Sequence, residues 1–150
     1  MTAGNGQDTE AGVAPDIGLV AILSGGDTAE QVELPAQVSE VLEATAALYR
    51  TTGFEPPWIG YVAVHEGKAV GTCAFKCAPV DGKVEIAYFT FPDFEHRGIA
   101  TAMARRLVAL ARTESPGVVV TAQTLPARNS SNRILERLGF RLAGTAVDAE

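Results

Sequence analysis

One acidic residue, Glu85, interrupts a mainly apolar stretch of the chain at residues 84–91. An unpaired carboxylate is costly in apolar surroundings, and burial disfavours the charged form of a carboxyl group. A carboxylate in such a place can take up a proton near neutral pH, so Glu85 could act as a general base toward an ammonium substrate. Two other interpretations stay open: the carboxylate pairs with a cation across the sheet, for example Lys76, or it faces solvent.

A glycine, Gly98, follows this stretch and opens an amphipathic segment. Because glycine has no side chain, a ligand can approach the backbone closely there. The first amides of a helix lack internal partners and carry the positive end of the helix dipole. Residues 97–101 could therefore hold phosphate oxygens. The alternative is that Gly98 only starts a helix and that Ala100 is only a small packing residue.

A strand and a helix would position these residues. β-branched and aromatic residues predict a buried strand over 84–91, which Pro92 ends. Apolar residues at three- and four-residue spacing predict a helix that begins at Gly98, namely Ile99, Met103, Leu107 and Leu110.

The remaining elements follow from the same patterns. A helix is predicted from Pro35 to near Gly53, with a stripe of Val38, Val41, Leu42, Thr45, Leu48 and Tyr49 on one face. Strands are predicted at 17–23, 58–65, 69–76, 118–124 and 140–147. The strands from 58 to 91 are expected to be antiparallel, and the Gly98 helix to cross over to a parallel strand at 118–124.

Size and charge narrow the possible functions. A chain of 150 residues is expected to be one domain, here 16–150, with a disordered leader at 1–15. Acidic residues outnumber basic ones 18 to 12, which argues against a nucleic-acid partner. No apolar run is long enough for a membrane helix, and the leader lacks the pattern of a signal peptide, so a cytoplasmic location is expected. The two cysteines, Cys73 and Cys77, are too far apart along a strand for a disulfide, and no metal site is expected.

The stretch Glu95-His96-Arg97-Gly98-Ile99-Ala100 resembles the acyl-CoA-binding motif of the GCN5-related N-acetyltransferase (GNAT) family. That motif has Gln or Arg, two residues, Gly, any residue, and then Gly or Ala, so the glycine and the alanine match and Glu95 departs. A second segment, with Asn129-Ser130-Ser131 and Leu138-Gly139-Phe140, resembles the branch of ribosomal-protein N-terminal acetyltransferases. The likeness covers about residues 58–140 in the expected order.

This resemblance implies an α/β (α+β) fold: a mixed, mostly antiparallel twisted sheet with a splayed parallel strand pair, flanked by helices. It implies an N-acetyltransferase that uses acetyl-CoA as co-substrate and acts on the primary amine of a small molecule or a peptide N-terminus. The alternative is a non-catalytic acyl-CoA-binding or regulatory module of the same fold. The family has a further strand after the one at 140–147, so we expect that strand to be absent or supplied by the partner in a homodimer.

The resemblance also assigns the site residues. Glu85 would be the base, and Ser131, with Ser130 as its rival, would serve the leaving thiolate, since Leu135 stands where many relatives have Tyr. Both serines could instead only cap a helix. The residues implied in acetyl-CoA binding are Phe89, Phe91, Arg97, Gly98, Ile99, Ala100, Thr101, Asn129 and Ser130. The aromatic residues that could line the acceptor pocket, or equally belong to the core, are Tyr49, Phe54, Trp58 and Tyr61.

Overall fold

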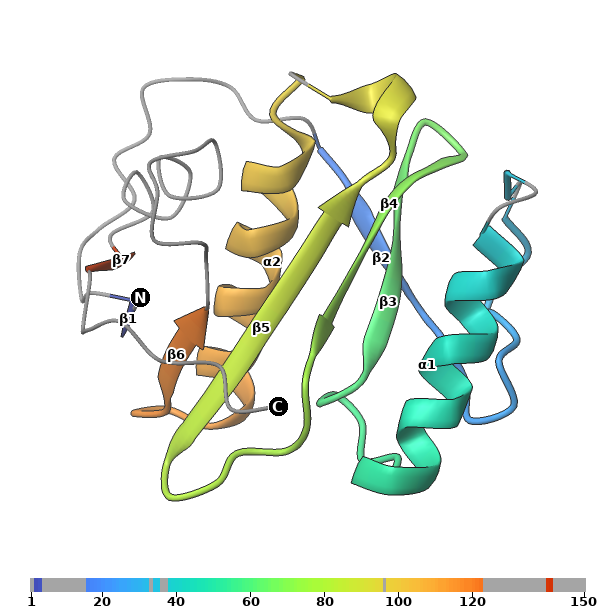
Figure 1. Ribbon diagram of the computed structural model, residues 1–150. Coiled ribbons are helices and arrows are strands. Elements are labelled where there is room, and N and C mark those ends of the chain that lie inside the picture. The colour runs from blue at the N-terminus through green and yellow to red at the C-terminus, as the bar shows by residue number, and fades with distance from the viewer. Residues whose placement is uncertain are drawn as a thin grey trace.

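The computed structural model describes residues 2–3, 16–32, 34–35, 38–95, 97–122 and 140–141. These residues form one twisted sheet with the strand order β2-β3-β4-β5-β6-β1-β7, flanked by helices α1 and α2 (Figure 1). The strands are β1 (Thr2–Ala3), β2 (Gly18–Ala21), β3 (Gly60–His65), β4 (Lys68–Phe75), β5 (Lys83–Thr90), β6 (Val119–Ala122) and β7 (Phe140–Arg141). The helices are α1 (Val38–Thr52), the short 3₁₀ helix η1 (Pro92–Phe94) and α2 (Ile99–Glu114).

The centre of the sheet confirms the predicted antiparallel strands. β2, β3, β4 and β5 pair antiparallel with their neighbours. The turn between β3 and β4 consists of Glu66 and Gly67, both with positive φ (53° and 82°), which matches the right-handed twist of a tight hairpin. β5 and β6 pair in parallel, with Glu85 opposite Thr121, and α2 is the predicted crossover between them.

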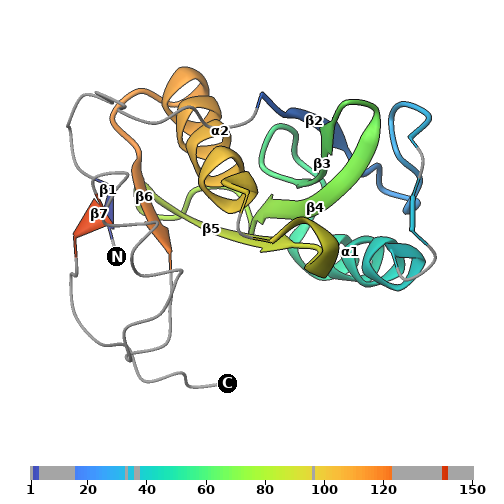
Figure 2. The same ribbon diagram turned by 90° about the horizontal axis from the view of Figure 1, so that it is seen from above.

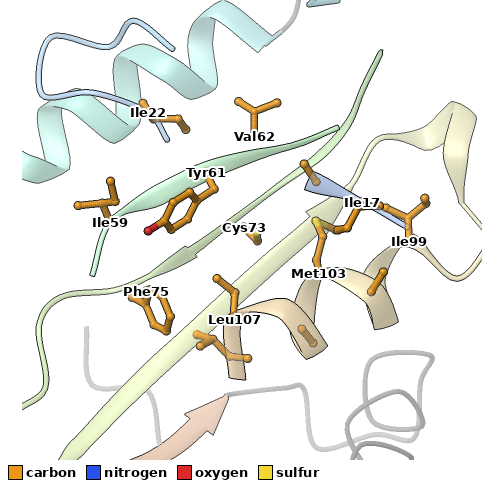
Figure 3. Close-up of a cluster of buried hydrophobic side chains, with 14 of the residues drawn as sticks. Ile17, Ile22, Ile59, Tyr61, Val62, Cys73, Phe75, Ile99, Met103 and Leu107 are labelled. Atoms are coloured by element: carbon orange, nitrogen blue, oxygen red, sulfur yellow. The ribbon is translucent and has the colours of Figure 1, made fainter. Parts of the chain in front are cut away.

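Helices α1 and α2 lie on opposite faces of the sheet (Figure 2). The largest buried side chains of α2 are Met103 and Leu107, which are fully enclosed against β4 and β5 (Figure 3). On the other face, the Tyr49 hydroxyl of α1 donates a hydrogen bond to the carbonyl of Ile22 (2.7 Å) and accepts one from the amide of Gly60 (2.9 Å). These bonds fix α1 over the β2–β3 side of the sheet.

The first helix departs from its prediction in two details. It begins at Val38 rather than Pro35, although the Val38 amide donates a hydrogen bond to the Pro35 carbonyl. Leu48, which we expected on the buried stripe, is 45 % exposed, because the described side chains of this helix that are buried are Val38, Ala46 and Tyr49.

The N-terminal segment also differs from its prediction at two residues. Thr2 and Ala3 form β1, which pairs antiparallel with both β6 and β7 and so lies between them. The rest of the predicted leader lies outside the described residues. The predicted last strand is seen at Phe140–Arg141, and its continuation to 147 lies outside them as well.

Candidate active site

The start of α2 has the geometry of an anion site. Gly98 has φ 80° and ψ 9°, a left-handed conformation that glycine adopts without strain. The structure shows no side-chain hydrogen bond that caps this helix end among the described residues, and its first turn carries no acidic residue. The amides of Ile99, Ala100 and Thr101 are the first of the helix, so they face outward from its positive end.

The approach to these amides is open. Arg97 and Gly98 are exposed, and the Arg97 guanidinium lies 5.6 Å from the centre of the Phe94 ring, a cation–π contact that holds it beside the helix start. The side chains of Ile99 and Thr101 point into the core and are buried. This stretch therefore offers backbone N–H groups and one guanidinium to a ligand.

The backbone of β5 presents alternate residues to its two neighbouring strands. The Phe91 amide donates a hydrogen bond to the carbonyl of Val70, the residue before Gly71, which pairs with Thr90. The Lys76 amide donates to the carbonyl of Glu85. The backbone N–H and C=O groups of the odd-numbered residues in β5 therefore point to β4. The Val119 amide of β6 donates to the carbonyl of Gly82, so the backbone groups of the even-numbered residues point to β6.

This alternation bears on the expected backbone contacts of the pantetheine, which stay a prediction. The sequence placed them near Phe89 and Phe91, but the groups directed to the β6 side belong to Tyr88 and Thr90. Pairing between β5 and β6 is described as far as Ile86 opposite Ala122, and the chain that follows Ala122 lies outside the described residues. The Thr90 hydroxyl is also buried without a hydrogen-bond partner in the described part of the chain. The splay expected at 123–124 lies outside the described residues.

Glu85 lies opposite Thr121 in this parallel pairing. Its Oε2 is 3.2 Å from Nζ of Lys76, the cross-strand pair that the sequence left open as an alternative. The Glu85 side chain is 25 % exposed and that of Lys76 is 57 % exposed, so the pair is reached by solvent. On the β6 side, the Thr121 hydroxyl is 3.4 Å from the Val84 carbonyl, to which it donates.

Lys76 and Glu85 belong to a row of side chains that we call the open strip. In β4 and β5 the buried side chains face α2, so alternation places their neighbours on the opposite face. The open strip consists of Thr72, Ala74, Lys76, Glu85, Ala87 and Phe89. Two of its members are small alanines, and Phe89 is 55 % exposed at one end.

The aromatic residues proposed for an acceptor pocket divide between core and boundary. Tyr49 and Tyr61 are buried, and burial, assisted by the neighbouring Cys73 thiol, raises the pKa of Tyr61 to about 12. The Tyr61 hydroxyl donates to the Pro57 carbonyl (2.6 Å). Phe54 and Trp58 are half-buried and pack against the core. The core interpretation therefore holds for both tyrosines.

Sequence reasoning named some of these residues and missed others. The predicted residues Asn129, Ser130, Ser131 and Leu135 lie outside the described residues. The missed residues are Tyr88 and Thr90, whose position depends on the strand pairing. The only sequence signal that could have found Thr90 was a hydroxyl between two phenylalanines in a buried strand.

A mixed sheet with one parallel pair, a crossover helix with an open N-terminus and helices on both faces is the architecture of an acetyltransferase of the GNAT class. A family model described as an acetyltransferase (GNAT) domain matches residues 15–141. The chain belongs to this family.

Known proteins similar to this chain come from several branches of the family. It is 32 % identical over 89 residues to N-acetylaspartate synthetase of Danio rerio, which covers 59 % of this chain and 31 % of that protein. The chain thus matches about a third of the length of this curated relative.

Solved structures share the fold at low sequence identity. RimL, a ribosomal L7/L12 alpha-N-protein acetyltransferase, superposes with a TM-score of 0.62 at 15 % identity over 85 % of this chain and 79 % of its own. The microcin C7 self-immunity acetyltransferase MccE, in complex with acetyl-CoA and AMP, gives 0.57 at 17 % identity over 73 % and 59 %. Among the described residues, no helix is long and apolar enough to cross a membrane.

Proposed function

We propose that this chain transfers an acetyl group from acetyl-CoA to a primary amine, that of a small molecule or of a peptide N-terminus. One observation carries the proposal: Glu85 stands on an open face of the sheet, in the strand that leads to the exposed, uncapped start of α2. A carboxylate that can accept a proton thus precedes the helix start that can hold the diphosphate of a thioester co-substrate.

The binding of acetyl-CoA would use two parts of the chain. The pyrophosphate would lie on the amides of residues 97–101, with the Arg97 guanidinium adding a positive charge. The pantetheine would run along the β6 side of β5, where Tyr88 and Thr90 present their backbone groups. Because the side chains of β5 alternate between the two faces, the Phe89 ring lies on the open strip and would lie near the thioester. Asn129 and Ser130 would add hydrogen bonds from the next segment.

The reaction needs a proton acceptor because an ammonium has no lone pair. The Glu85 carboxylate would accept one proton from the ammonium, directly or through water. The amine nitrogen then attacks the thioester carbonyl carbon, the C–N bond forms and the C–S bond breaks. Ser131, or its neighbour Ser130, would donate a hydrogen bond to the departing thiolate. The thiolate takes up the second proton, which the nitrogen loses once the C–N bond has formed, and leaves as the free thiol of CoA.

The names of the relatives support an amine acceptor without fixing its kind. They refer to N-acetylaspartate, to an aminoglycoside and to the alpha-amino group of a ribosomal protein. We propose an acceptor within this range of amines. A cytoplasmic location and a homodimer stay predictions.

The test measures thiol release from acetyl-CoA over a panel of amines, together with acetyl-CoA binding by calorimetry. The variant Glu85→Gln should lose about 10²–10⁴-fold in kcat while it keeps its affinity for acetyl-CoA. The matched control is Glu43→Gln, because Glu43 is an exposed carboxylate on α1. It should keep both kcat and affinity.

A non-catalytic acyl-CoA-binding module is the second candidate, favoured by the ion pair that already engages Glu85 and by the Glu95 departure. It predicts acetyl-CoA binding without thiol release for any amine. Absence of acetyl-CoA binding at millimolar concentration would reject both functions.

A further inference from the structure

Lys76 and Glu85 form a pair of opposite charges that solvent reaches, on the face of the sheet opposite α2. Their side chains stand opposite each other on β4 and β5, and the Lys76 amide bonds to the Glu85 carbonyl beneath them. Such a solvent-reached pair contributes little to stability. Its position on the open strip, with both side chains reached by solvent, makes the pair available to a ligand instead.

The pair has hydrogen-bonding capacity to spare. An ammonium has three donors and a carboxylate has two acceptor oxygens. The contact between Nζ and Oε2 uses one of each, and the described part of the chain gives neither side chain a further partner. The neighbouring members of the open strip, Ala74 and Ala87, are too small to cover these groups.

From this geometry we propose that the Lys76–Glu85 pair recognises the zwitterion of a free α-amino acid as acetyl acceptor. The inference rests on the proposed function and narrows its acceptor. In a free amino acid the ammonium and the carboxylate are joined through one carbon and lie about 3 Å apart. The charges of the protein pair are 3.2 Å apart. The two pairs can therefore stand side by side with opposite charges in contact, the ammonium on Glu85 and the carboxylate on Lys76.

This arrangement separates the two acceptor kinds that the proposed function leaves open. A peptide N-terminus has a neutral amide where the free amino acid has its carboxylate, so it gives Lys76 no anionic partner. A free amino acid fills both halves of the pair and places its nitrogen on the proposed base. Glu85 thus binds the group that it deprotonates, and Lys76 is a specificity-determining residue.

The test compares free amino acids with their neutral analogues. L-alanine and L-phenylalanine are assayed against their α-carboxamides by thiol release from acetyl-CoA. The free amino acids should have a kcat/KM at least roughly ten-fold higher. Lys76→Met keeps the aliphatic stem and should abolish this preference by raising KM for the free amino acids relative to the carboxamides, while any change in kcat that follows from the loss of the Glu85 partner should be shared by both substrates. Lys76→Arg should restore most of the preference because it restores the charge.

Lys83 provides a matched control. It is exposed on the same face of β5, two residues from Glu85, and no ion pair joins it to another described residue. Lys83→Met removes the same charge from the same face and should leave the preference intact. Carboxamides that react as well as free amino acids, or an equal loss on both in Lys76→Met, would overturn the inference.

A binding measurement separates this inference from the proposed function. Calorimetry with L-alanine on the CoA-saturated protein needs no turnover. Binding that Lys76→Met abolishes, with no thiol release for any amine, would reject the enzyme and keep the inference. Thiol release without preference or amino-acid binding would keep the enzyme and reject the inference. Loss of both would reject both.

Discussion

Gly71 of β4 lies directly against Met103 of α2. A Cβ added to Gly71 would stand 3.0 Å from the Met103 Cε, 3.1 Å from its Sδ and 2.6 Å from the Phe89 carbonyl oxygen of β5. Helix α2, which presents the proposed anion site, therefore packs on a position of β4 that has no room for a side chain. The same glycine also leaves no room for a Cβ beside the Phe89 carbonyl of β5.

The first prediction concerns this contact. Gly71→Ala should lower the free energy of unfolding by about 1–3 kcal/mol, because the carbonyl of β5 cannot yield as a flexible side chain could. Gly18→Ala is the control, since an added Cβ there meets nothing within 4 Å. Its stability should stay the same or rise by up to about 1 kcal/mol. Urea denaturation measures both, and equal values for the two variants would contradict the packing described.

The second prediction concerns the left-handed Gly98. Gly98→Ala should cost roughly 1–2 kcal/mol of stability and also weaken acetyl-CoA binding by about ten-fold or more, because the strained turn redirects the first amides of α2. Gly117→Ala carries the same type of strain, with φ 91° and nothing near its Cβ, on the far end of the helix. It should lose stability and keep its affinity. Calorimetry with acetyl-CoA decides, and an equal affinity for both variants would argue against the anion site.

The third prediction concerns the Tyr49 hydroxyl, which joins α1 to β2 and β3. Tyr49→Phe leaves the Ile22 carbonyl and the Gly60 amide without their partner in a buried place. The free energy of unfolding should fall by about 1–3 kcal/mol. Thr52→Val removes an exposed hydroxyl bond to the Leu48 carbonyl and should change stability by less than about 0.5 kcal/mol. A Tyr49→Phe protein as stable as the parent would show that α1 is held by other contacts.

The fourth prediction concerns the two cysteines. Burial raises the pKa of the Cys73 thiol to about 12, whereas Cys77 is only half-buried. Because the thiolate is the reactive form, an aromatic disulfide reagent at pH 8 should modify Cys77 rapidly and Cys73 only as the protein unfolds. Cys77→Ser should remove the fast phase alone. Two fast thiols in the native protein would contradict the burial of Cys73.

The fifth prediction concerns alkaline pH. The pKa of Tyr61 is about 12 in the folded protein and ordinarily 10.0, so the unfolded chain loses this proton first. The stabilising contribution is complete below pH 10 and is lost as the pH rises to 12, on the order of 1–3 kcal/mol. Tyr61→Phe should show a flatter decline over this range, in equilibrium unfolding followed at several pH values. A parallel decline in parent and variant would exclude Tyr61 as its source.

Much of the fold could be predicted because it depends on local patterns. The period of two in β3, β4 and β5 and the apolar spacing of α2 are properties of short segments, and the structure has these elements within one to three residues of their predicted ends. The parallel pairing of β5 and β6 followed from the length and hand of the crossover. Gly98 was identified as the start of a helix because it stands directly before the apolar spacing of α2.

Other features depended on which strands become neighbours. The alternation of side chains could be read from the sequence, but the direction of each backbone amide depends on the register with β4 and β6. The sequence therefore placed the pantetheine contacts near Phe89 and Phe91, whereas the hydrogen bonds of β5 leave Tyr88 and Thr90 on the β6 side. Pairing also brings Lys76 to Glu85, the cross-strand contact that the sequence left open beside the role of a base.

The sequence by itself determined the order of the predicted helices and strands and the start of a helix at Gly98. It also determined that Glu85 lies in a strand, because neighbouring residues decide each of these features. Only the tertiary structure decided that Thr2–Ala3 lies between β6 and β7 and that Lys76 meets Glu85. Contacts of this kind join residues far apart along the chain, and their free energy comes from the assembled sheet rather than from any one segment.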